Sequence, residues 1–103
     1  MDTMVQSIDN LTALTGRVAE IGPHPRLAGW DRVLMDVLDA GPVPGRADLL
    51  SRRAGERLEL AVRHDLLGNA APGATLRLRA KLSSGEVIAE PHPDEGDFTV
   101  RPP

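Results

Sequence analysis

The stretch Ala74-Thr-Leu-Arg-Leu-Arg-Ala-Lys-Leu82 alternates apolar and polar side chains with a period of two. The apolar positions are Ala74, Leu76, Leu78, Ala80 and Leu82, and the polar positions are Thr75, Arg77, Arg79 and Lys81. Because successive side chains of a strand point to opposite faces, this period predicts a strand with one buried face. A helix would spread the same leucines around its whole circumference. The stretch therefore predicts a strand with an apolar inner face and a basic outer face.

Similar patterns predict four further strands and a short edge strand. The expected strands are 12–22, 30–39, 57–63, 87–90 and a last short one around Phe98 and Val100. Val18 and Ile21 have opposite parity, which indicates either two partly covered faces or a bend, and Gly16 would permit a bend or bulge.

Proline and glycine mark the connections between these strands. We expect a rigid loop at 23–29 and a hairpin turn at 83–86. Residues 41–56 predict an ordered connection that packs Leu49 and Leu50 against the strands, with a single helical turn at 48–53 as the alternative. Residues 64–73 predict a compact connector whose Leu66 and Leu67 close an open end of a barrel.

The length of 103 residues indicates one domain with a modest core. We divide the chain into an N-terminal tail or short helix at 1–11, a barrel at 12–101 and a tail at 102–103. The helical alternative at the start depends on the spacing of Met4, Val5, Ile8 and Leu11.

Composition excludes several classes of site. The chain has no cysteine, so disulfides, thiolate metal sites and cysteine nucleophiles are ruled out. No apolar run approaches the length of a membrane span, and nothing resembles a signal peptide, so we expect a cytoplasmic protein with no membrane partner. The net charge of −3 and the presence of one Trp, one Phe and no Tyr argue against a dedicated nucleic-acid binder.

The predicted fold class is all-β: a small five- to six-stranded Greek-key barrel with at most short helical turns. The order of its predicted strands and connections resembles that of the OB-fold superfamily over about residues 12–101. The resemblance depends on the glycine-containing first strand Leu14-Thr15-Gly16-Arg17-Val18, on the entry Leu66-Leu67 to Pro72-Gly73-Ala74-Thr75-Leu76, and on the hairpin after it. It is similar also to the OB-like TOBE domains. The short connector at 64–73 departs from the many OB-folds that carry a full helix there.

The OB-fold resemblance implies a binding face on the second and third strands, flanked by the loops 23–29 and 83–86. The residues implied are Trp30, Arg32, Leu34, Asp36, Leu38, Glu59, Ala61 and Arg63. An apolar centre with a charged rim is typical of a protein–protein or homodimer contact. The alternative is that the connection 41–56 folds over this face.

A second candidate surface is the basic ladder Arg17, Arg77, Arg79 and Lys81, along which the phosphates of a nucleic acid could lie. The preferred interpretation is a solvated outer face whose charges are balanced by Glu20, Glu86 and Glu90.

Catalytic and metal chemistry find little support in the sequence. A three-histidine metal site would need His24, His64 and His92 to converge, and we expect the loops that carry His24 and His64 to emerge at opposite ends of the barrel. No Gly-x-Ser-x-Gly and no phosphate loop is present. We therefore expect no enzyme activity, no metal and no cofactor.

The resulting hypothesis is a non-catalytic OB-fold interaction module that acts through protein contacts as an accessory or homo-oligomeric protein. The alternative is a single-stranded nucleic-acid binder that also uses Trp30, Arg32 and Arg63. A small-molecule-binding barrel is the third hypothesis.

Overall fold

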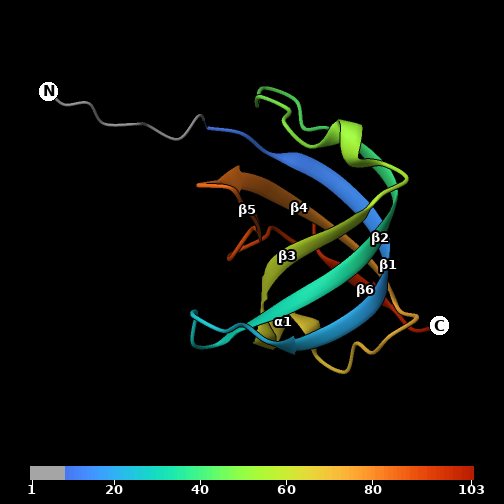
Figure 1. Cartoon of the computed structure of the whole chain (residues 1–103). Helices are drawn as coiled ribbons and strands as arrows, with labels where there is room; N and C mark the ends of the chain where they lie inside the picture. Colours follow the sequence, from blue (N-terminus) through green and yellow to red (C-terminus); the bar gives the residue numbers. More distant parts are fainter. Residues whose placement is uncertain (1–8) are drawn as a thin grey trace, which may run out of the picture.

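The computed structural model of the chain describes residues 9–103, which form a closed five-stranded β-barrel with one extra strand (Figure 1). The strands are β1 (Thr12–Pro23), β2 (Trp30–Pro42), β3 (Arg57–Arg63), β4 (Thr75–Ser83), β5 (Glu86–Ala89) and β6 (Thr99–Arg101). The helical elements are the 3-10 turn η1 (Ser51–Arg53) and the single-turn helix α1 (His64–Leu67). The predicted all-β class is confirmed. The tail or short helix expected at 1–11 falls mostly outside the described residues, which begin at Asp9.

Strand β1 closes the barrel because it pairs with β2 along one edge and with β4 along the other, both antiparallel. Strand β3 pairs antiparallel with β2 and parallel with β5, and β5 pairs antiparallel with β4. The predicted edge strand is β6, which pairs with the first part of β4. Neighbours in the sheet are thus not always neighbours in the chain, as in a Greek key.

The bend predicted in the first strand is present. The register of β1 against β2 shifts between Thr15 and Gly16 and again between Val18 and Glu20. A Cβ atom on Gly16 would lie 2.4 Å from the Met35 side chain and 2.7 Å from the Asp36 carbonyl oxygen. Glycine is therefore required at this irregular point of the β1–β2 pairing, where a side chain would overlap Met35 and Asp36.

The inward face of β4 confirms the alternation from which the fold was predicted. Leu76, Leu78 and Ala80 are at most 1 % exposed and pack in a core made from all five barrel strands. Other side chains that fill the barrel are Leu14, Val33, Met35, Val37, Leu60 and Val62. Apolar side chains thus occupy the barrel interior.

The two long connections pack against the barrel as expected, with one exception. Leu50 and Leu67 are buried in the core, whereas Leu49 is 42 % exposed, so its predicted packing is wrong. Figure 1 shows η1 near one end of the barrel and α1 near the other. The alternative of a helical turn before residue 54 is realised as η1.

Ordered packing begins before the predicted start of the barrel. The Asn10 side chain donates to the Leu82 carbonyl oxygen at 3.0 Å and accepts from the Leu82 amide at 2.9 Å, in the manner of a neighbouring strand. Asn10 and Leu11 are both buried, and the Leu11 amide bonds to the Ala47 carbonyl oxygen. The segment 9–11 therefore extends β1 along β4 beyond the last paired residues, Thr12 and Ala80.

Candidate binding cleft

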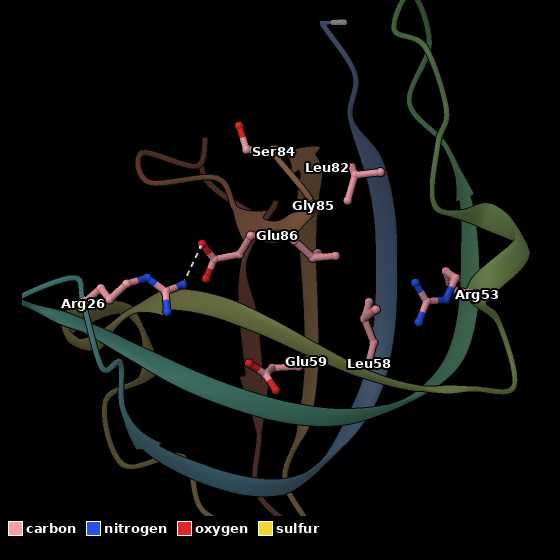
Figure 2. A pocket seen from close by; sticks show the side chains of 9 residues that line it. Arg26, Arg53, Leu58, Glu59, Leu82, Ser84, Gly85 and Glu86 are labelled. Carbon is pink, nitrogen blue, oxygen red and sulfur yellow. Dashed lines mark ion pairs between the residues drawn. The ribbon is translucent and has the colours of Figure 1, made fainter. Parts of the chain in front are cut away.

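A cleft of about 420 Å³ opens beside the β4–β5 hairpin (Figure 2). It is bordered by β3, by η1 and by the loop that joins β1 to β2. The residues that line it are Arg26, Arg53, Leu58, Glu59, Leu82, Ser84, Gly85, Glu86 and Val87. The cleft thus lies beside the two loops, 23–29 and 83–86, that the OB-fold resemblance implied as flanks of a binding face, but of the residues implied for that face only Glu59 lines it.

The cleft exists because β3 and β5 pair over only two positions, Leu60 with Val87 and Ala61 with Ile88. The first residues of β3 have no strand partner on that side in the described chain. Leu58 and Val87 are buried and Leu82 is half-buried, so these three side chains make an apolar floor.

His24 holds the two loops together. Its Nδ1 accepts hydrogen bonds from the Arg26 and Leu27 amides, both at 3.0 Å. Because Nδ1 is an acceptor, the ring proton lies on Nε2, which donates to Glu86 Oε2 at 2.7 Å. The ring is 3 % exposed. One buried histidine therefore fixes the shape of the β1–β2 loop and its contact with the β4–β5 hairpin.

Each arginine at the cleft has a carboxylate partner. Arg26 lies 3.7 Å from Glu86, the pair drawn in Figure 2, and Arg53 pairs with Glu56 at 2.7 Å. Glu59, on the opposite wall, pairs with Arg32 of β2 at 3.2 Å. The rim is polar but its charges are largely compensated.

The outer surface of β2 and β3, called here the β2–β3 face, continues from the cleft across β3. It consists of Trp30, Arg32, Leu34, Asp36, Leu38, Arg57, Glu59 and Arg63. Trp30 and Leu34 are half-buried and Leu38 is 54 % exposed. Arg57 donates to both oxygens of Asp36, at 2.8 and 3.2 Å, and this hydrogen bonding holds the pKa of the Asp36 carboxyl below its usual range.

The connection 41–56 leaves part of this face open. Its backbone bonds to both polar groups of Val37, with Glu56 accepting at 2.9 Å and Gly55 donating at 2.8 Å. The end of this connection therefore extends the pairing of β3 with β2 by one or two residues. The alternative in which this connection covers the face does not hold at Leu38.

Two residues that the resemblance implied for the binding face, Ala61 and Arg63, are buried or engaged in contacts within the chain. Ala61 is 0 % exposed, because it is a small side chain between Arg32 and Ile88 in the neighbouring strands, and it offers no surface to a partner. Arg63 donates to the Pro91 carbonyl oxygen at 2.7 Å and pairs with Asp65. Arg63 therefore holds the segment after β5 in place.

The basic ladder is not balanced as expected. Arg79 pairs with Asp97 at 3.4 Å, and Arg17, Arg77 and Lys81 are exposed. Within residues 9–103, no ion pair joins the ladder to Glu20, Glu86 or Glu90, and Glu86 is bound to His24 instead.

The three histidines have separate partners. His64 Nδ1 lies 2.8 Å from Asp31 Oδ2, and the hydrogen bond to Asp31 raises the pKa of His64. His92 Nδ1 lies 3.1 Å from the Arg63 guanidinium. The described residues contain no group of three or more histidine or carboxylate side chains placed to hold a metal ion.

The expectation that the histidine loops emerge at opposite ends of the barrel is wrong. The His64 amide donates to the Gly29 carbonyl oxygen at 2.9 Å, so the β1–β2 loop and the connector after β3 meet.

Comparisons with protein-family models, with curated proteins and with solved structures gave no match to this chain. No helix in the described part of the chain is long and apolar enough to cross a membrane.

Sequence reasoning located the two loops of the cleft but missed Arg53 and Leu58 as lining residues. Only the Pro-His-Pro triplet around His24 gave a local signal, and it did not identify Glu86 as the partner.

Proposed function

We propose that this chain is a non-catalytic, OB-like binding module that contacts protein through the cleft and the β2–β3 face, with a second copy of the chain as partner. The strand pairing supports the OB-like assignment, since β1 pairs with both β2 and β4 while β3 runs parallel to β5. The meeting of the β1–β2 and β4–β5 loops at His24 and Glu86 supports the location of the binding region.

The observation that carries the proposal is the compensation of charge on this surface. Arg26, Arg32, Arg53, Arg57 and Arg63 each have a carboxylate partner. A surface that binds nucleic acid needs unpaired cations to displace counterions from phosphates. Paired charges around apolar side chains suit a protein surface instead.

Self-association is supported by the exposed Leu38 on a face that carries charges of both signs. In a two-fold contact the same patch serves both copies, and arginines that already have carboxylate partners limit the repulsion between the two copies. Leu38 then loses water contact on both sides of the axis.

The single-stranded nucleic-acid alternative remains a prediction. It requires cations on this face that have no carboxylate partner. The small-molecule hypothesis has less support, because apolar side chains fill the barrel interior.

The fluorescence of Trp30, the one tryptophan of the chain, tests the proposal. Its emission should shift to shorter wavelength as protein concentration rises, because self-association removes water from the half-buried ring. A labelled oligonucleotide titrated at low salt should bind no more tightly to this protein than to its Arg32→Gln variant. Emission that is constant with concentration, or oligonucleotide binding that this variant abolishes, would count against the proposal.

A further inference from the structure

The outer surface of β1, β4 and β6 carries an alternating array of arginine and threonine. In one row across the strands Thr15 pairs with Arg77, which pairs with Thr99. In the next row Arg17 pairs with Thr75, which pairs with Arg101. We call these six residues the Arg/Thr patch.

All six side chains lie on one face, because directly paired residues of a sheet point to the same side. The opposite side is fixed as the interior by Leu76, which is 0 % exposed. Arg17 and Arg101 are two strand spacings apart, about 10 Å, and Arg77 lies about 7 Å along β4 from the line between them. Three long guanidinium side chains can therefore reach one common volume.

This patch differs in charge from the β2–β3 face. Within the described residues no ion pair is formed by Arg77 or Arg101, and both are exposed. Arg17 lies opposite Asp36 in the ladder, and the charge of Asp36 partly compensates it, although both Asp36 oxygens are hydrogen-bonded to Arg57. Arg77 and Arg101 have no such carboxylate, and their proximity costs free energy in the empty state.

A hollow of about 390 Å³ lies over the patch. It is lined by Thr15, Thr75, Arg77, Thr99, Val100, Arg101 and Pro102, and it has no acidic side chain in its wall. Three hydroxyl groups and two guanidinium groups are therefore available as hydrogen-bond donors around a space large enough for an anion of several heavy atoms.

We propose that the Arg/Thr patch binds a compact multivalent phosphate anion, of the pyrophosphate or tripolyphosphate class. Planar guanidinium groups bind phosphate oxygens through paired hydrogen bonds, and threonine hydroxyls complete the coordination. Arg77 and Arg101, the two arginines that line the hollow, lie on neighbouring strands and suit an anion of two or three phosphorus atoms.

The boundaries of the patch favour a compact anion over a nucleic-acid strand. Further along β4 the next outward cation, Arg79, is bound by Asp97 at 3.4 Å, so the row of free cations is interrupted there and separates the patch from the exposed Lys81. None of the six residues is aromatic, and stacking of bases on aromatic rings is the usual means of holding single strands. The proposed anion site uses residues outside the β2–β3 face. Its test is therefore independent of the test of self-association.

Calorimetric titration of the full chain with sodium tripolyphosphate at low ionic strength tests this site. The wild-type protein should saturate at one anion per chain, and Arg77→Gln with Arg101→Gln should weaken binding about tenfold or more, since two charged hydrogen-bonding groups are lost. The control, Arg46→Gln with Arg52→Gln, has the same net charge and should bind within about twofold of wild type.

Equal weakening in both double variants would show diffuse attraction to charge and would overturn the proposal, as would the absence of saturable binding to wild type. Tighter binding of a twelve-nucleotide single strand than of tripolyphosphate would assign the patch to nucleic acid instead. Amide shifts in NMR spectra of the wild-type protein keep the test independent of variant folding. Tripolyphosphate should move the amides of β4 and β6 around Arg77 and Thr99, and shifts confined to other strands would refute the site.

Discussion

His24 Nε2 donates a hydrogen bond to Glu86 Oε2 at 2.7 Å, and this contact joins the β1–β2 loop to the β4–β5 hairpin across 62 positions of sequence. Because the same ring accepts two backbone amides through Nδ1, its removal would take the acceptor from the Arg26 and Leu27 amides and leave Glu86 with Arg26 as its remaining partner.

Substitution of this histidine by alanine should therefore destabilise the protein. We expect His24→Ala to lower the free energy of unfolding by about 2–4 kcal/mol, since each lost hydrogen bond to a poorly solvated group costs about 1–3 kcal/mol and water recovers part of it. Urea denaturation measures the change. His92→Ala, at an exposed histidine, serves as control and should change stability by less than about 0.5 kcal/mol. Equal stability of the two variants would mean that His24 does not hold the loops.

Asn10 supplies a second long-range contact that can be tested by substitution. Asn10→Ala should cost about 2–4 kcal/mol, because it leaves the Leu82 amide and carbonyl without the partners that the side chain provides. Asn10→Asp should be intermediate in its effect, since a carboxylate can accept from the amide but cannot donate to the carbonyl oxygen. Thermal and urea unfolding would both report the order. An unchanged free energy of unfolding in Asn10→Ala would contradict the strand-like role of this side chain.

Gly16 lets β1 lie close to Met35 and Asp36 of β2. Gly16→Ala should destabilise by about 1–3 kcal/mol, because the new methyl group overlaps the Met35 side chain and the Asp36 carbonyl oxygen. Gly41→Ala is the matched control, since a Cβ there meets nothing within 4 Å, and it should be close to neutral. Adding Met35→Ala to Gly16→Ala should not restore stability, because the overlap with backbone remains. If the double variant regained wild-type stability, the steric overlap would lie entirely with the Met35 side chain.

The pair of His64 and Asp31 predicts a specific pH dependence. The hydrogen bond to Asp31 raises the pKa of His64 above its ordinary value of 6.5, so the pair stabilises the fold fully below that pH and loses its contribution as pH rises through the raised value. In Asp31→Asn the NMR-measured pKa of His64 should fall back toward 6.5. The substitution Asp94→Asn, at an exposed carboxylate that is not among the charges acting on His64, should leave it unchanged. If the pKa of His64 is the same in Asp31→Asn as in the wild-type protein, the pairing of His64 with Asp31 is refuted.

Local alternation was sufficient to predict the strands. The stretch 57–63 was predicted with the observed bounds of β3, and the parity conflict of Val18 and Ile21 correctly indicated a bend in β1. The end of β2 was placed too early, at residue 39, because Gly41 and Pro42 resemble a break, whereas they pair with Ala13 and Thr12 at the edge of the sheet.

The contacts that shape the cleft could not be predicted in the same way. A period of two tells which side chains point inward, but it does not tell that β3 and β5 share only two pairs or that His24 reaches Glu86. Ala61 shows the same limit, since its parity points outward while its longer neighbours bury it. Such pairings depend on closure of the barrel, which joins residues far apart in the sequence.

Sedimentation equilibrium of the wild-type chain and of two leucine variants tests the proposed function most directly. Leu38 and Leu49 are both exposed, at 54 % and 42 %, but only Leu38 lies on the β2–β3 face. The proposal predicts a reversible dimer of the wild-type chain that Leu38→Glu weakens about tenfold or more, because the change occurs twice in a two-fold contact, and that Leu49→Glu leaves unchanged. A chain that stays monomeric up to millimolar concentration, or a dimer that both variants weaken equally, would contradict it.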